Sequence, residues 1–74
     1  MDTPYPDERL ENWFSYHRPK TGQPEKYEEI RGAAHNFAKV VVRLTPSSAD
    51  QSAALRKIRE AVMTANAAIA CGGK

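Results

Sequence analysis

The sequence has few of the residues that reinforce a small protein. It is 74 residues long and contains a single cysteine, Cys71, and only two histidines. One cysteine cannot form an internal disulfide, and without a cluster of Cys or His residues a structural metal site is not expected. A single domain of this length has a core worth only about 3–5 kcal/mol. We therefore expect self-association to add stability, and we expect neither a metal nor a cofactor.

Long apolar segments are also missing. Residues 1–6 lack the apolar run of a signal peptide, and no stretch approaches the ~20 apolar residues of a membrane-spanning helix. The formal net charge of +2, with pI ≈ 8.9, is too small to indicate a duplex-DNA binder. These absences predict a cytoplasmic protein that binds neither a membrane nor duplex nucleic acid.

No catalytic set is recognisable. The sequence has no Ser/His/Asp order, no paired carboxylates beside a credible base and no glycine-rich loop that would cradle a phosphate. We therefore expect a binding protein, with no catalytic residues, in place of an enzyme.

The sequence does contain helical periodicity. We expect a single domain of residues 1–74, with an irregular N-terminus (1–6) and a C-terminal tail (72–74). Asp7 is a possible cap of a first short helix, and Pro19 disfavours helical geometry at Arg18, so this helix should end near His17. We expect its apolar face to anchor it to the rest of the chain through Leu10, Trp13 and Phe14.

Two long helices should follow. The first should begin within residues 21–24, with Thr21 as a possible cap, and end at Leu44; after a turn at residues 45–48, Ser47 should cap the next helix, with Asp50 three residues on. Both helices repeat apolar residues at spacings of three and four, which predicts an all-α fold with a long antiparallel two-helix hairpin. The apolar positions are Tyr27, Ile30, Ala34, Phe37, Val41 and Leu44, then Leu55, Ile58, Val62, Ala65 and Ile69.

The bend at residues 14–19 is the candidate binding site. An aromatic ring such as Tyr16 can stack on a flat base, and a guanidinium such as Arg31 can pair with an anion, so together the two side chains would suit a nucleotide. Each also has a simpler interpretation: Tyr16 as a packing aromatic, and Arg31 as a surface charge paired with Glu28.

Two further groups of residues could bind anions. A basic row on the first long helix repeats every four residues and suits phosphates, although a solvated basic face is the commoner explanation of such a row. On the next helix, three polar or basic residues would converge on one anion if three copies met around an axis. The row is Arg31, His35, Lys39 and Arg43, and the second group is Ser52, Arg56 and Arg59.

Five segments in this order resemble the phage anti-CBASS family of cyclic-nucleotide sponges, which shares a helical hairpin domain with one class of phage anti-Thoeris proteins. They are FSYHRP (14–19), YEEIR (27–31), LTP (44–46), AALRKI (53–58) and EAVMTANAAIA (60–70). The resemblance implies a homohexamer that captures cyclic oligonucleotide signals without hydrolysing them, in the cytoplasm of an infected bacterium.

The resemblance also implies a role for individual residues. Tyr16 would stack on a base of a cyclic dinucleotide in a pocket shared by two protomers, and Arg31 would contact its phosphate. Further candidate contacts in that pocket are His17, Lys26, Tyr27 and His35, and Ser52, Arg56 and Arg59 would belong to a separate cyclic trinucleotide pocket. Arg56 and Thr64 depart from the residues expected in the family, in the second pocket and between subunits respectively.

Two alternatives stay open. The ligand could be a cyclic ADP-ribose isomer of the kind used by Thoeris defence, or the hairpin could be a small regulator that binds a protein or nucleic acid through its basic row. The regulator hypothesis predicts that Lys39→Ala and Arg43→Ala impair function whereas Tyr16→Ala has little effect.

Overall fold

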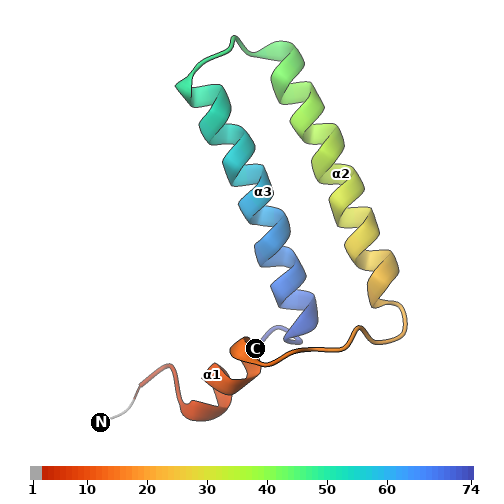
Figure 1. The fold of residues 1–74 in the computed structure, drawn as a ribbon, viewed down its shortest axis with the longest axis vertical. Coiled ribbons are helices and arrows are strands. Elements are labelled where there is room, and N and C mark those ends of the chain that lie inside the picture. Colours follow the sequence, from red (N-terminus) through yellow and green to blue (C-terminus); the bar gives the residue numbers. More distant parts are fainter. Residues whose placement is uncertain (1–2) are drawn as a thin grey trace.

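The computed structural model describes residues 3–74, which form three helices and no strand (Figure 1). Helix α1 spans Asp7–Phe14, α2 spans Gln23–Leu44 and α3 spans Ala49–Ala70. Helices α2 and α3 run antiparallel side by side, and α1 lies beyond the end of the hairpin, close to the C-terminus of the chain. The predicted all-α hairpin is confirmed.

The hairpin packs along the predicted apolar seam, with one difference on α2. All five predicted seam residues of α3 are half-buried. On α2, Phe37 and Leu44 are exposed, whereas Ala38 is half-buried. A small side chain at the contact lets two helices approach closely, and the larger residues then lie on one side of the seam.

The cap residue of each long helix lies one position later in the sequence than predicted. The hydroxyl of Ser48, not that of Ser47, accepts a hydrogen bond from the N–H of Gln51 (3.1 Å) and caps α3. Gly22, not Thr21, precedes α2, with φ 85° and ψ −15°. These are the angles of the third residue of a type II turn, a position that favours glycine, and the N–H of Gln23 closes the turn on the carbonyl of Lys20 (3.0 Å).

Helix α1 is shorter than predicted and is anchored differently. It begins at Asp7 with Pro6 in the cap position, and it ends at Phe14 because Ser15 turns extended and donates its hydroxyl to the carbonyl of Glu11. A serine hydroxyl that binds the backbone in this way competes with helix continuation. The side chain of Phe14 is 84% exposed, so the prediction that it anchors α1 to the hairpin is wrong in a single chain.

The C-terminal tail predicted for residues 72–74 is an ordered turn. Gly72 and Gly73 have φ 65° and 77°, and their N–H groups bond back to the carbonyls of Ile69 (3.3 Å) and Ala68 (2.8 Å). This pair of bonds is the Schellman motif, which ends a helix on left-handed glycines. At the other end of the chain, residues 3–6 are non-helical as predicted, and Met1 and Asp2 lie outside the described residues.

The chain is thin and open. Its extents are 48 × 35 × 15 Å, and the radius of gyration is 16.0 Å, against about 11 Å for a compact chain of this length. Between residues 3 and 74 no side chain is fully buried. A search of the same residues found no helix with the length and apolar character needed to cross a membrane.

Candidate functional site

The bend after α1 presents Tyr16 to solvent from a segment that is fixed at both ends. Its side chain is 86% exposed, so the alternative in which it packs against the same chain is wrong. On one side of it, Ser15 ends α1; on the other, His17 is half-buried. An exposed aromatic ring on a fixed backbone can stack on a flat ligand at little conformational cost.

His17 is held against α1 and the end of α3. Its Nε2 lies within hydrogen-bonding distance of the carbonyl of Asn12, and because a carbonyl can only accept, Nε2 carries the proton in this contact. The thiol of Cys71 lies 3.8 Å from the same carbonyl and 3.9 Å from Nε2. These contacts hold His17, the residue that directly follows Tyr16, in place.

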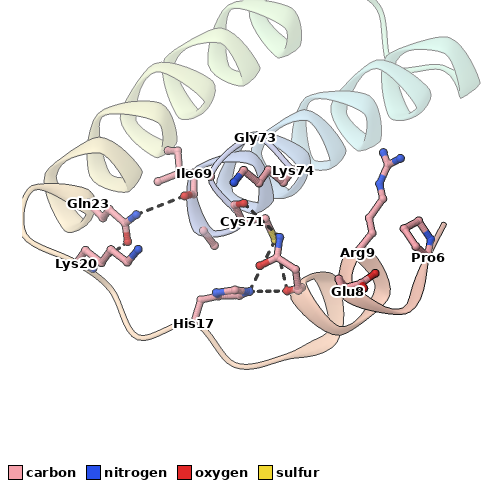
Figure 2. A pocket seen from close by; sticks show the side chains of 13 residues that line it. Pro6, Glu8, Arg9, His17, Lys20, Gln23, Ile69, Cys71, Gly73 and Lys74 are labelled. Carbon is pink, nitrogen blue, oxygen red and sulfur yellow. Dashed lines mark hydrogen bonds between the residues drawn. The ribbon is translucent and has the colours of Figure 1, made fainter. Parts of the chain in front are cut away.

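A cavity of about 820 Å³ opens between the bend, α1 and the C-terminal turn (Figure 2). Three basic side chains, Arg9, Lys20 and Lys74, and one carboxylate, Glu8, line it. Ile69 and Ala70, the last two residues of α3, and Cys71 also line the cavity.

Hydrogen bonds join α1 and the start of α2 to the end of α3. The side-chain amide of Asn12 donates to the carbonyl of Cys71 (3.3 Å), and the indole N–H of Trp13 donates to the main-chain oxygen of Lys74 (2.8 Å). The side-chain amide of Gln23 donates to the carbonyl of Ile69 (3.3 Å), as Figure 2 shows, and its oxygen accepts from the N–H of Lys20 (2.9 Å).

The indole of Trp13 also belongs to a small aromatic cluster within the N-terminal segment. The ring of Tyr5 meets it edge-on with 5.7 Å between centroids, and the guanidinium of Arg9 lies 4.9 Å from the Trp13 ring and 5.2 Å from the Tyr5 ring. Arg9 also donates to the carbonyl of Pro4 (2.8 Å). Cation–π contacts of this kind give α1 local order without an apolar core.

The other predicted dinucleotide contacts lie on α2, outside this cavity. Arg31, His35 and Lys26 are exposed, and Tyr27 is half-buried. Arg31 lies about 12 Å along α2 from its first residue. Neither of the two cavities described is lined by Tyr16 or by Arg31.

The second cavity is an apolar groove of about 580 Å³ along the hairpin. Ala33 lines the groove and lies two residues from both Arg31 and His35, so its side chain points ~200° away from theirs around the axis of α2. The groove and the basic row therefore lie on different sides of α2. The groove is lined by Ile30, Ala33, Ala34, Phe37 and Val41 of α2 and by Ala54, Lys57, Ile58, Ala61, Val62 and Ala65 of α3.

The predicted trinucleotide contacts are exposed on the first half of α3. Ser52, Arg56 and Arg59 line neither cavity. Their spacing of four and three residues places them along one side of the helix. In a single chain they form no enclosed site.

Sequence reasoning missed the residues that join the bend to the end of α3, chiefly Asn12, Gln23 and the indole N–H of Trp13. Their acceptors are main-chain oxygens of Ile69, Cys71 and Lys74. Every residue has such an oxygen, so no sequence pattern marks these acceptors. The available signal was the Gly72–Gly73 pair, which predicted a helix end and therefore unpaired carbonyls.

The protein-family model described as "Acb2/Tad1, hairpin domain" matches residues 6–70, which include all three helices. No curated protein and no solved structure matches the chain.

Proposed function

Because the chain belongs to the Acb2/Tad1 hairpin domain family, the family of anti-CBASS and anti-Thoeris sponge proteins, we propose that it binds and sequesters cyclic oligonucleotide second messengers without cleaving them. The family is associated with sponge-like binding of signalling molecules. Cyclic dinucleotides are the proposed ligands, with cyclic trinucleotides as a second class. Their capture would deprive a CBASS effector of its activator.

The observation that carries this proposal is the exposed ring of Tyr16 on a fixed bend. Base–aromatic stacking contributes about 1–3 kcal/mol per base and needs a ring that is free on one face. Arg31 is exposed on α2 and is available to pair with a phosphate, to which a guanidinium donates two parallel hydrogen bonds.

The proposed site is shared between two copies of the chain. Tyr16 and Arg31 line neither of the two cavities described in one chain, which supports a site that a second protomer completes. We propose the homohexamer as the assembled form.

A second candidate ligand is a cyclic ADP-ribose isomer, because the matching family model covers anti-Thoeris as well as anti-CBASS proteins. Such a ligand also offers a flat base and phosphates, so the same tyrosine and arginine would bind it. Competition between the two ligand classes distinguishes one shared site from two.

Calorimetry with the purified protein and a panel of cyclic dinucleotides, cyclic trinucleotides and cyclic ADP-ribose isomers tests the proposal. We expect a cyclic dinucleotide to bind and to return intact, by chromatography, after the protein is denatured. The absence of binding across the panel would refute the sponge proposal, and recovery of a cleaved ligand would show an enzyme instead.

A further inference from the structure

Helix α1 is attached to the hairpin in part by polar contacts. Phe14 is 84% exposed, whereas Leu10 (37%) and Trp13 (40%) are more than half covered, and the ring of Tyr5, from the same N-terminal segment, meets Trp13 edge-on. Asn12 and Trp13 donate hydrogen bonds to the end of α3, and the thiol of Cys71 lies 3.9 Å from His17. The position of α1 therefore depends in part on these polar contacts.

These contacts end on one turn of the chain. The Schellman turn at Gly72 and Gly73 uses the carbonyls of Ala68 and Ile69. The carbonyl of Cys71 accepts from Asn12 and also from the N–H of Lys74 (3.3 Å), and the main-chain oxygen of Lys74 accepts from Trp13. Cys71 directly follows α3, so its carbonyl lies at the negative end of the helix dipole, which strengthens it as an acceptor.

Tyr16 follows this anchored segment directly. Asn12 lies four residues before it and Trp13 three, and the carbonyl of Asn12 also contacts His17, the residue after it. The backbone that carries Tyr16 is thus held, before and after this residue in the sequence, by residues that contact the C-terminal turn.

We propose that the C-terminal turn of α3 holds the ligand-contacting bend in place through Asn12 and Trp13, which act as positioning residues for Tyr16. This inference rests on the proposed function. When the two hydrogen bonds break, α1 and the bend leave the hairpin, and only the fraction of chains with α1 docked binds ligand at full strength.

The test replaces Asn12 with aspartate, a side chain of the same shape that has no N–H and carries a negative charge. Its carboxylate faces the carbonyl of Cys71 at the negative end of α3, so α1 should undock. Asn36→Asp is the matched control, because it makes the same chemical change at an exposed position of α2 that lines neither cavity.

Trp13 supplies a direct measure of docking. It is the only tryptophan in the chain, so its indole N–H gives a single NMR signal, whose hydrogen exchange reports the bond to Lys74. We expect faster exchange in Asn12→Asp than in wild type or Asn36→Asp, with unchanged helix content and mass. Saturating cyclic dinucleotide should slow that exchange again, because a ligand that binds the docked state repopulates it.

Affinity for the cyclic dinucleotide should fall at least tenfold in Asn12→Asp and should stay at the wild-type value in Asn36→Asp. Trp13→Phe, which keeps an aromatic ring but removes the indole N–H, should also weaken binding, without adding charge. Unchanged affinity in both Asn12→Asp and Trp13→Phe would overturn the inference and leave the proposed function standing. A wild-type protein that binds no cyclic nucleotide would overturn the proposed function, and the inference with it.

Discussion

Tyr16 is the residue on which the proposed site depends most, because its exposed ring makes no packing contribution that a substitution would remove. Tyr16→Ala should weaken cyclic dinucleotide binding by roughly 5- to 150-fold, the range that corresponds to loss of one base–aromatic stack. Tyr16→Phe keeps the stacking face and should bind within about threefold of wild type, since only the hydroxyl is lost. Calorimetry measures both, and equal affinity of Tyr16→Ala and wild type would contradict the role given to the ring.

Arg31 should contribute through charge and paired hydrogen bonds. Arg31→Ala should weaken binding by roughly 10- to 150-fold, the range expected for a lost charged hydrogen bond, whereas Arg31→Lys should recover part of the loss because it keeps the charge but not the fork. The affinity of Arg31→Ala should also depend less on salt than that of wild type, which titrations at several salt concentrations would show.

Lys39→Ala and Arg43→Ala provide the comparison for Arg31, because both residues are exposed in the same basic row. A ligand held at Arg31 and Tyr16 leaves these two variants near wild-type affinity. If they abolish function while Tyr16→Ala does not, the basic row binds a protein or a nucleic acid and the sponge proposal is wrong.

At the scale of one element, the start of α3 distinguishes two adjacent serines. The hydroxyl of Ser48 accepts from the N–H of Gln51, whereas no such bond is formed by Ser47. Ser48→Ala should therefore lower the free energy of unfolding by about 1 kcal/mol, the usual effect of a lost helix cap, and Ser47→Ala should have almost no effect. Urea unfolding at one fixed protein concentration compares them, and a larger loss in Ser47→Ala would contradict the structure.

The helix bodies and the helix ends were predictable to different degrees. The apolar spacing predicted the body of α3, because the residues that it identifies are the ones half-buried against α2. The helix ends depend on which of two neighbouring residues occupies the cap position, Ser47 or Ser48 in α3 and Thr21 or Gly22 in α2. The apolar spacing does not distinguish between them.

The attachment of α1 was not predictable for a different reason. An apolar face at Leu10, Trp13 and Phe14 suggested burial, but Phe14 is 84% exposed, and hydrogen bonds from Asn12 and Trp13 to main-chain oxygens contribute to the attachment. The exposure of Tyr16 is compatible with a ligand-stacking role, which stays a prediction. The residues that support it were not predictable, because backbone acceptors leave no pattern in the sequence.

For the whole molecule, the exposed area is larger than that of a compact monomer of the same mass. It has an accessible surface of 6319 Å², whereas a compact monomer of 8.2 kDa has about 4,500 Å². The excess of about 1,800 Å² corresponds to roughly two standard interfaces of about 800 Å² per partner. A protomer with two such interfaces fits a closed assembly of more than two copies better than a dimer.

The apolar groove is the part of this surface that a second copy is most expected to cover, and Phe37 is its largest residue and is 58% exposed. Phe37→Glu places a charge in the groove and should lower the mass in solution towards that of a single chain of 8.2 kDa. Lys39→Glu introduces the same side chain two residues away, on the opposite side of α2, and serves as the control.

Sedimentation equilibrium gives the masses, and thermal unfolding at several protein concentrations gives their consequence for stability. The wild-type midpoint should rise with concentration, since association stabilises the folded state by mass action, and that of Phe37→Glu should be lower. Because Tyr16 and Arg31 share no cavity in one chain, Phe37→Glu should also lose ligand binding without touching either residue. A wild-type protein that sediments as a monomer at tens of micromolar and still binds ligand would show that the site is complete in one chain, and the shared pocket would be wrong.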